Sequence, residues 1–219
     1  MTAKSSTTNG KFPSRSLFVD HLAVARGNRM LLEGLTFELM AGEALVITGP
    51  NGSGKSSLLR TIAGLSPAAE GELTLDGIPL SDDPAAYLQQ IHMVFSHNAL
   101  SGLLRKAEQI EFFQALYHST AALDDTFDIA SDLPEAQLVQ FFSTGQKRRL
   151  AMARLNLAPR PLWLLDEPEN GLDRDHRRAL EQMINAHLDD QGMVILATHN
   201  PFNLKRAKSL HLVDAEAAS

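Results

Sequence analysis

The feature that most constrains the fold is the stretch GPNGSGKSS, which begins at residue 49, directly after an apolar run at residues 44–48. It fits the pattern G-x-x-x-x-G-K-[S/T], in which a strand ends, a glycine-rich loop turns its N–H groups inward and a helix begins. The helix N-terminus adds a partial positive charge, so the loop suits phosphate groups. Lys55 is expected to reach the β- and γ-phosphates of a nucleotide, and Ser56 to coordinate Mg²⁺. The predicted phosphate-binding residues are Gly49, Pro50, Asn51, Gly52, Ser53, Gly54, Lys55, Ser56 and Ser57.

Two further short apolar runs, at residues 162–165 and 193–197, are continuous rather than alternating, like the run before the loop. Continuous apolarity is typical of strands covered on both faces, as in a parallel sheet. Helix-period stretches follow the first two runs, with Gly64 and Gly192 as the expected stops. The pattern therefore predicts an α/β fold. The stretches GPNGSGKSS, DEPENGLD and THNP follow the three runs, so they are expected to meet at one ligand-binding edge of the sheet.

Asp166 and Glu167 follow the second apolar run, which places them at the same expected edge. Hydrolysis of a nucleoside triphosphate needs one carboxylate on the phosphate-bound Mg²⁺ and a second beside the attacking water. We assign Asp166 to the metal and Glu167 to polarising the water. Acidic pairs elsewhere in the chain follow no apolar run and are expected to be solvated surface.

The remaining segments predict two smaller units beside this core. Residues 17–39 alternate like antiparallel strands, and residues 71–77 read as a strand that ends in an Asp-Gly turn. Residues 84–158 read as a helical subdomain, with no strong strand after residue 95. The polar residues 1–16 are expected to be a disordered tail, and residues 17–219 a single domain.

Composition excludes several classes of protein. The net charge of −6 argues against general binding to nucleic-acid phosphates, which needs a basic face. The absence of cysteine excludes disulfides, thiol nucleophiles and cysteine-ligated metals. No apolar run reaches the ~18 residues that a membrane span needs, and the N-terminus lacks the apolar region of a secretory signal. The expected location is therefore the cytoplasm.

Four motifs occur in order along the chain: GPNGSGKSS, FSTGQKRRL, LLDEPENGLD and LATHN. From about residue 17 to residue 213 the chain resembles the nucleotide-binding subunit of ATP-binding cassette (ABC) transporters. The resemblance implies a P-loop NTPase core with a RecA-like mixed sheet, an antiparallel β subdomain and a helical subdomain. It implies an ATPase that uses ATP and Mg²⁺, with Lys55, Glu167 and His199 as catalytic residues. His199 would be the switch histidine that touches the γ-phosphate.

The resemblance also gives a role to the second motif, which has no obvious chemistry of its own. In this family the motif completes the nucleotide site of a second copy, packed head-to-tail, when ATP binds. Ser143, Gly145 and Gln146 would therefore face the γ-phosphate bound by the other subunit of a homodimer. Asp173 would belong to the loop that links the two sites. Ser143 or Thr144 is also a candidate N-cap of the helix that follows.

Three departures from the family pattern bear on the site. Thr144 stands where a glycine is usual, and its β-branch stiffens the backbone. The glutamine expected near the metal is absent, so Asn98, followed by His97, is the best match for this Mg²⁺-sensing position. Arg26 stands where an aromatic residue usually stacks on adenine, although an arginine can also stack on a base.

Finer features are similar to the ATPase subunit of the haem exporter of bacterial cytochrome c maturation. They include His97-Asn98, GQKRRLAMARL and PLWLLDEP. This resemblance implies integral-membrane permease partners, docked in a groove near His97 and Asn98, and a peripheral location at the cytoplasmic face of the inner membrane.

Four alternatives remain open from the sequence. The chain could serve another ABC exporter, or act without a permease as a soluble assembly scaffold. It could be a small-molecule kinase that shares only the phosphate loop, or a module that binds nucleotide and hydrolyses it poorly. Glu167 and His199 argue against the last of these, and the second motif argues against the kinase.

Overall fold

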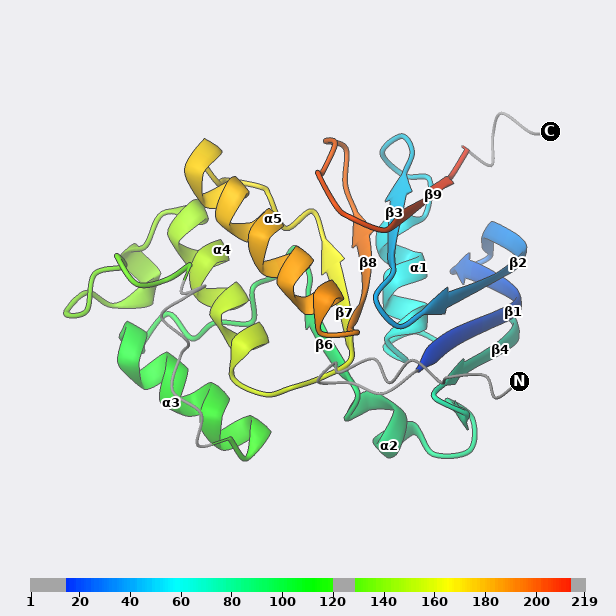
Figure 1. The fold of residues 1–219 in the computed structure, drawn as a ribbon, viewed down its shortest axis with the longest axis horizontal. Helices are drawn as coiled ribbons and strands as arrows, with labels where there is room; N and C mark the ends of the chain where they lie inside the picture. The colour runs from blue at the N-terminus through cyan, green and yellow to red at the C-terminus, as the bar shows by residue number, and fades with distance from the viewer. Residues whose placement is uncertain (1–14, 120–128, 214–219) are drawn as a thin grey trace, which may run out of the picture.

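The computed structural model describes residues 15–119 and 129–213, which form two β-sheets and a group of helices at one end (Figure 1). A five-stranded sheet has the order β6-β7-β8-β3-β9, and a four-stranded sheet has the order β2-β1-β4-β5. The helices α3 and α4 lie on the far side of the five-stranded sheet from the four-stranded one (Figure 1). Of the expected tail at residues 1–16, residues 1–14 fall outside the described residues, whereas Arg15 and Ser16 are described and Ser16 begins β1.

The five-stranded sheet holds the three apolar runs. Its strands are β3 (Ala44–Thr48), β6 (Ile91–Val94), β7 (Leu162–Asp166), β8 (Met193–Ala197) and β9 (Ala207–His211). All pairs in this sheet are parallel, and every residue of β7 and β8 is buried. The prediction of buried parallel strands is confirmed.

The antiparallel strands form the separate four-stranded sheet. It contains β1 (Ser16–Arg26), β2 (Arg29–Met40), β4 (Glu70–Leu75) and β5 (Ile78–Pro79). The turn between β4 and β5 uses Asp76 and Gly77 with φ of 54° and 75°. Two successive positive φ values are what a tight hairpin requires, so the predicted Asp-Gly turn is confirmed.

Helices cover both faces of the parallel sheet. Helix α1 (Lys55–Ile62) lies between the two sheets, where Leu58 and Leu59 share a core with Leu164 of β7. Helix α5 (Arg174–Asp189) covers the opposite face, where Leu180 joins Leu165 of β7 in a second core. Successive side chains of a strand point to opposite faces, so β7 joins both layers and is fixed in position from each side.

The other helices lie between β5 and β7 along the chain. They are α2 (Pro84–Leu88), α3 (Lys106–Tyr117), the short 3₁₀ turns at Val139–Phe141 and Arg154–Asn156, and α4 (Thr144–Ala153). The range 84–158 expected for a helical subdomain also contains β6, which pairs with β7 in the parallel sheet. In the part that the structure describes, residues 95–158 hold no strand, only an isolated bridge between Arg105 and Leu138.

One of the two expected helix stops is wrong. Gly64 follows α1 with φ of 66°, as a glycine stop should. After α5 the left-handed residue is Gln191, with φ of 66°, and not Gly192. Gly192 is required for space instead, because a Cβ there would lie 2.1 Å from Nε2 of His187. Within the described ranges, no helix is long and apolar enough to cross a membrane.

Candidate functional site

The loop at residues 49–54 joins the end of β3 to the start of α1, as its sequence predicts. Gly49 and Gly54 have φ of 146° and 97°, and a Cβ on Gly49 would lie 2.4 Å from the carbonyl oxygen of Leu212. Nζ of Lys55 donates hydrogen bonds to the carbonyl oxygens of Gly49 and Pro50, each at 2.8 Å. The ammonium is therefore held over the loop, where phosphate oxygens would replace these carbonyls.

A cavity of about 330 Å³ opens over this loop. Its lining includes the loop, Glu167 and the arginines Arg26 and Arg29 of the antiparallel sheet. The described lining contains no aromatic side chain, so Arg26 is placed where the sequence expected a substitute for the adenine-stacking residue. A guanidinium plane can stack on a base, which suits this end of the cavity to a nucleobase.

Ser56, which lines this cavity, is in contact with Asp166. Oγ of Ser56 donates a hydrogen bond to Oδ1 of Asp166 at 3.0 Å, which joins the start of α1 to the end of β7. Burial raises the pKa of Asp166, and the neighbouring charge of Glu167 raises it further, while Ser56 and Arg148 oppose the rise. Mg²⁺ is commonly bound by one or two protein oxygens together with phosphate oxygens and water, and this oxygen pair fits that chemistry.

The Lys55 ammonium interacts electrostatically with the carboxylates of Asp166 and Glu167. Burial lowers the pKa of Lys55, while the charges of Glu167 and Asp166 oppose that change. The Lys55 ammonium therefore lies near two carboxylates in a partly buried setting, before any ligand adds its own charge. An anionic ligand with a bound divalent cation complements this set of charges.

Glu167 occupies a strained backbone position. Its φ is 47°, which is uncommon for a residue other than glycine, and its N–H donates to the carbonyl oxygen of Ala197 at 2.8 Å. Oε1 lies 3.3 Å from Nε2 of His199, and Oε2 accepts a hydrogen bond from Nδ2 of Asn170 at 2.6 Å. The carboxylate is thus oriented from two sides, beside the loop that ends β8. The structure brings Glu167 and His199 together, as their motifs predict.

Glu169 holds the two residues that flank His199, a role that the sequence did not indicate. This buried carboxylate accepts hydrogen bonds from Oγ1 of Thr198 and from Nδ2 of Asn200. It therefore ties the loop after β7 to the residues on either side of His199. From the sequence, Glu169 resembles a solvated surface glutamate. Its role is visible only when the fold packs the loop after β8 against it.

Arg148 is a second residue that sequence reasoning missed. It is only 3% exposed, and its guanidinium donates to the carbonyl oxygens of Phe95, Asp166 and Glu167 and to Oδ1 of Asn98. It therefore joins the ends of β6 and β7 beneath Asp166 and Glu167. The run KRR indicated only a basic helix, and nothing in it marked which arginine is buried.

Arg148→Met is expected to lower the free energy of unfolding by about 3 kcal/mol, because it leaves buried acceptors without a donor. Urea denaturation of the full chain measures the effect. Lys147→Met is the matched control, since the Lys147 ammonium donates to the carbonyl oxygen of Gln140 at the surface. The control is expected to cost less than about 1 kcal/mol, and equal losses in the two variants would contradict the bridging role of Arg148.

Asn98 is the predicted metal residue that the structure does not bring to the site. Its Oδ1 accepts the hydrogen bond from Arg148 at 3.0 Å, and it is not part of the described lining of the loop cavity. His97 lines a different cavity, beside α3. A direct contact between Asn98 and Mg²⁺ stays a prediction.

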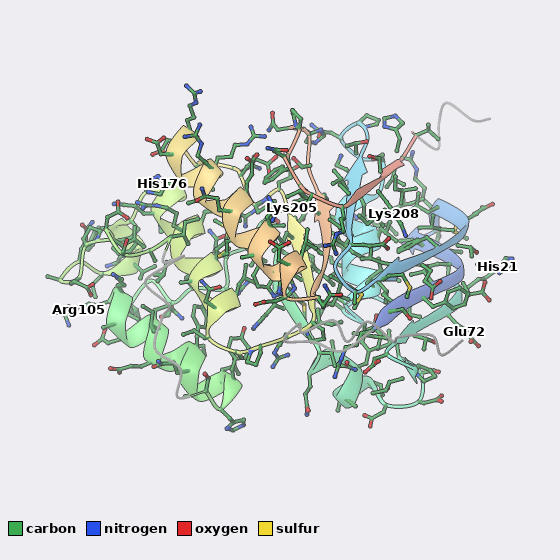
Figure 2. The ribbon with its side chains drawn as sticks, viewed as in Figure 1. His21, Glu72, Arg105, His176, Lys205 and Lys208 are labelled. Carbon is green, nitrogen blue, oxygen red and sulfur yellow. The ribbon has the colours of Figure 1, made fainter. Side chains whose placement is uncertain are left out.

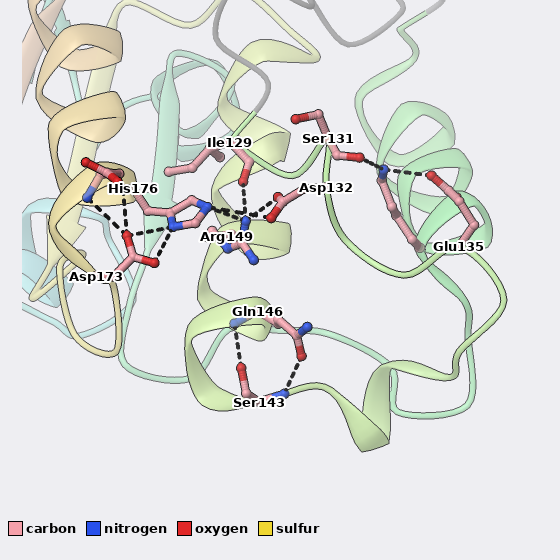
Figure 3. A network of polar contacts seen from close by, with 11 residues as sticks. Ile129, Ser131, Asp132, Glu135, Ser143, Gln146, Arg149, Asp173 and His176 are labelled. Carbon is pink, nitrogen blue, oxygen red and sulfur yellow. Dashed lines mark hydrogen bonds and ion pairs between the residues drawn. The ribbon is translucent and has the colours of Figure 1, made fainter.

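Ser143 caps α4, as one of its two predicted roles requires. Its Oγ accepts from N–H of Gln146 at 3.2 Å, and its own N–H donates to Oε1 of Gln146 at 2.8 Å (Figure 3). This reciprocal pair satisfies two backbone donors at the helix start. Thr144 is the first helical residue and is exposed.

Ser143, Gly145 and Gln146 lie at a second cavity, of about 110 Å³, together with Asp173 and His176. They are not among the described residues that line the first cavity. Nucleotide-loop residues and second-motif residues therefore face separate cavities of one chain, although both sets are suited to bind phosphate.

A protein-family comparison decides the identity of this arrangement. The family described as "ABC transporter" matches residues 32–170. The chain belongs to the ABC transporter family. The family, the fold class and the ATPase activity expected from the sequence are thereby confirmed.

Relatives of this ABC ATPase include proteins named "Cytochrome c biogenesis ATP-binding export protein CcmA". The one from Paramagnetospirillum magneticum is 43% identical over 198 residues, which cover 88% of this chain and 91% of the relative. The one from Rhizobium meliloti is 37% identical over 202 residues, covering 90% of this chain and 97% of the relative. The finer resemblance noted in the sequence is confirmed by these names.

Solved structures show the same fold. A putative ABC transporter ATP-binding protein from Pyrococcus furiosus has a TM-score of 0.77 at 22% identity, covering 89% of this chain and 97% of that one. An ATP-binding cassette dimer in a post-hydrolysis state with ADP and phosphate has a TM-score of 0.72 at 24% identity, covering 84% and 88%.

Proposed function

We propose that this ABC ATPase is the ATP-hydrolysing subunit of the haem exporter of cytochrome c biogenesis. The observation that carries the proposal is the similarity to cytochrome c biogenesis export proteins over nearly the whole of both chains. Haem as the cargo rests on the resemblance stated from the sequence. The cargo itself is expected to be handled by the permease rather than by this chain.

The nucleotide is proposed to lie in the cavity over residues 49–57, with its base toward Arg26 and its phosphates on the loop. Lys55 would neutralise the β- and γ-phosphates, and Ser56 and Asp166 would hold Mg²⁺, which supplies charge neutralisation at the phosphates when bound. Glu167 would accept a proton from the attacking water, and His199 would orient the γ-phosphate. The support is the 3.3 Å approach of His199 to Glu167 and the 3.0 Å contact of Ser56 with Asp166.

The active form is proposed to be a head-to-tail homodimer closed by ATP. Ser143, Gly145 and Gln146 lie at a cavity separate from that of the nucleotide loop, so they have no nucleotide to serve within their own chain. In the dimer they would meet the γ-phosphate bound by the other copy, at the N-terminus of α4. Hydrolysis would remove that shared ligand and reopen the dimer.

The membrane partners are proposed to dock in an apolar groove of about 420 Å³ beside α3. The groove is lined by residues that include Met93, Phe95, Leu116 and Tyr117. Leu116 is 57% exposed, and so is Leu65, which also lines the groove. An apolar segment of a permease would cover these side chains and place the subunit peripherally at the cytoplasmic face of the membrane.

A pull-down of the tagged subunit from its native membranes in mild detergent is expected to recover small integral-membrane proteins together with a haem absorbance band. Mass spectrometry identifies the proteins. Leu116→Glu tests the groove, because it places a charge there and leaves the nucleotide loop intact. The variant is expected to lose the partners and keep MgATP binding.

Two other outcomes would count against the proposal. Recovery of an unrelated permease without haem would keep the ABC mechanism and remove the haem exporter. Recovery of the subunit from the soluble fraction alone would favour a scaffold that works without a permease.

A further inference from the structure

A chain of polar contacts connects the loop after β7 to helix α4 (Figure 3). Nδ1 of His176, in the first turn of α5, lies 2.8 Å from both carboxylate oxygens of Asp173. Nε2 of the same ring lies 2.6 Å from Nη1 of Arg149 on α4. Arg149 is buried and also pairs with Asp132. Figure 2 shows His176 at the N-terminal end of α5, beside the helical part and far from His21 on the antiparallel sheet.

The hydrogen-bond donors and acceptors around His176 determine which nitrogen of the imidazole carries the proton. A guanidinium only donates, so Nε2 of His176 is the acceptor of the contact with Arg149. The ring proton then resides on Nδ1, where it is donated to Asp173. Asp173 also accepts from the N–H groups of Asp175 and His176. His176 therefore links Asp173 to Arg149 on α4 through side-chain contacts.

A direct backbone contact joins the same two elements. A Cβ on Gly145, in the first turn of α4, would lie 2.1 Å from the carbonyl oxygen of Gly171. Gly171 has φ of 80°, which favours glycine. The loop at residues 170–173 and the start of α4 are thus packed backbone to backbone at one end and linked through His176 and Arg149 at the other.

We propose that His176 and Arg149 are positioning residues that make this loop and the start of α4 a single unit for closing on the nucleotide of a second copy. The inference rests on the head-to-tail dimer proposed above. Groups that meet a ligand from two separate elements must keep their relative position within about 0.5 Å. Removing the imidazole leaves Asp173 its helix cap and frees the loop from Arg149, so dimer closure weakens while the nucleotide loop of the same chain is untouched.

The test uses the full chain carrying Glu167→Gln, in which ATP is expected to stay intact and the closed dimer to persist. His176→Ala in this background is expected to raise the dimer dissociation constant at saturating MgATP about tenfold, measured by sedimentation. The MgATP affinity of the monomer and the urea midpoint are expected to stay unchanged. A residue with a merely structural role would move the urea midpoint as well.

Two replacements of the imidazole separate its two contacts. His176→Gln places an acceptor near the position of Nε2 and is expected to restore most of the dimer affinity. His176→Asn supplies a donor for Asp173 but does not reach Arg149, so it is expected to behave like His176→Ala. Arg178→Gln, at an exposed position on the same helix, is the matched control and is expected to dimerise like its parent.

Dimerisation of His176→Ala at the parent affinity would overturn the inference, and so would rescue by Asn rather than Gln. If the Glu167→Gln parent itself stays monomeric in MgATP, the head-to-tail dimer fails and the inference falls with it. The parent measurement therefore tells the two failures apart.

Discussion

Glu167→Gln is expected to slow ATP hydrolysis at least about 100-fold while MgATP binding continues, because a side chain that takes a proton in the transition state typically contributes 10²–10⁴-fold. The amide has the size of the carboxylate and can still accept the hydrogen bond from Asn170. It cannot take a proton from water at neutral pH. The bound ATP therefore persists, and the variant is expected to accumulate as a dimer in gel filtration with MgATP.

The dimer formed by this variant should depend on the second motif. Ser143→Arg, added to Glu167→Gln, places a long cation at the cavity where the partner's phosphate would enter. We expect the double variant to bind MgATP as a monomer. A dimer that survives Ser143→Arg would contradict the composite site, and rapid hydrolysis by Glu167→Gln would show that another group activates the water.

The sequence was informative wherever one short segment carries its own physical requirement. The glycine-rich loop and the continuous apolar runs are of this kind, because a phosphate loop needs its glycines and a strand buried on both faces needs apolar residues throughout. These two signals were enough to place Lys55, Ser56, Asp166 and His199 at one edge of a parallel sheet. The structure shows Ser56 on Asp166 and His199 on Glu167.

Strand β9 shows where such reasoning stops. It pairs with β3 along Ala207–His211, yet its side chains are mostly exposed, so it carries no apolar run to mark it. An edge strand of this kind is held by backbone hydrogen bonds to its neighbour, which any sequence can make. Its existence depends on where the rest of the fold leaves an open sheet edge.

Buried charges escaped prediction for a related reason. Arg148 and Arg149 are adjacent, and both are buried, but they contact different elements. Arg148 contacts the end of β7 beneath Asp166 and Glu167, whereas Arg149 contacts His176 in the first turn of α5. A basic pair in a helix ordinarily indicates a solvated face. Only the tertiary contacts show that each guanidinium satisfies carbonyl or carboxylate oxygens brought from distant parts of the chain.

Gly192 was predicted to end α5 by its left-handed backbone, and that reason is wrong. A glycine after a helix usually provides a left-handed residue, and Gln191 takes that conformation here. Gly192 instead leaves room for the ring of His187, which stacks on Trp163 at 3.8 Å with an 8° angle between the planes. The glycine was noticed correctly, but its reason lies in packing that no local pattern reveals.

Lys55→Ala is expected to raise the dissociation constant for MgATP at least about 100-fold. Nζ is already held over the loop by the carbonyl oxygens of Gly49 and Pro50, so phosphate oxygens meet a preorganised cation. A hydrogen bond to a charged group contributes about 1.5–3 kcal/mol. Two such bonds, to the β- and γ-phosphates, correspond to about two decades or more in affinity. Equilibrium binding of a fluorescent ATP analogue measures the change.

The controls for this variant separate charge from geometry. Lys205→Ala removes an exposed lysine that pairs with Asp189 on α5, and it should bind MgATP like the parent. Lys55→Arg keeps the charge but presents a planar fork in place of a point charge, so it is expected to lose most of the affinity as well. Tight MgATP binding by Lys55→Ala would contradict this assignment, because the phosphates would then be bound without the ammonium that the loop holds in place.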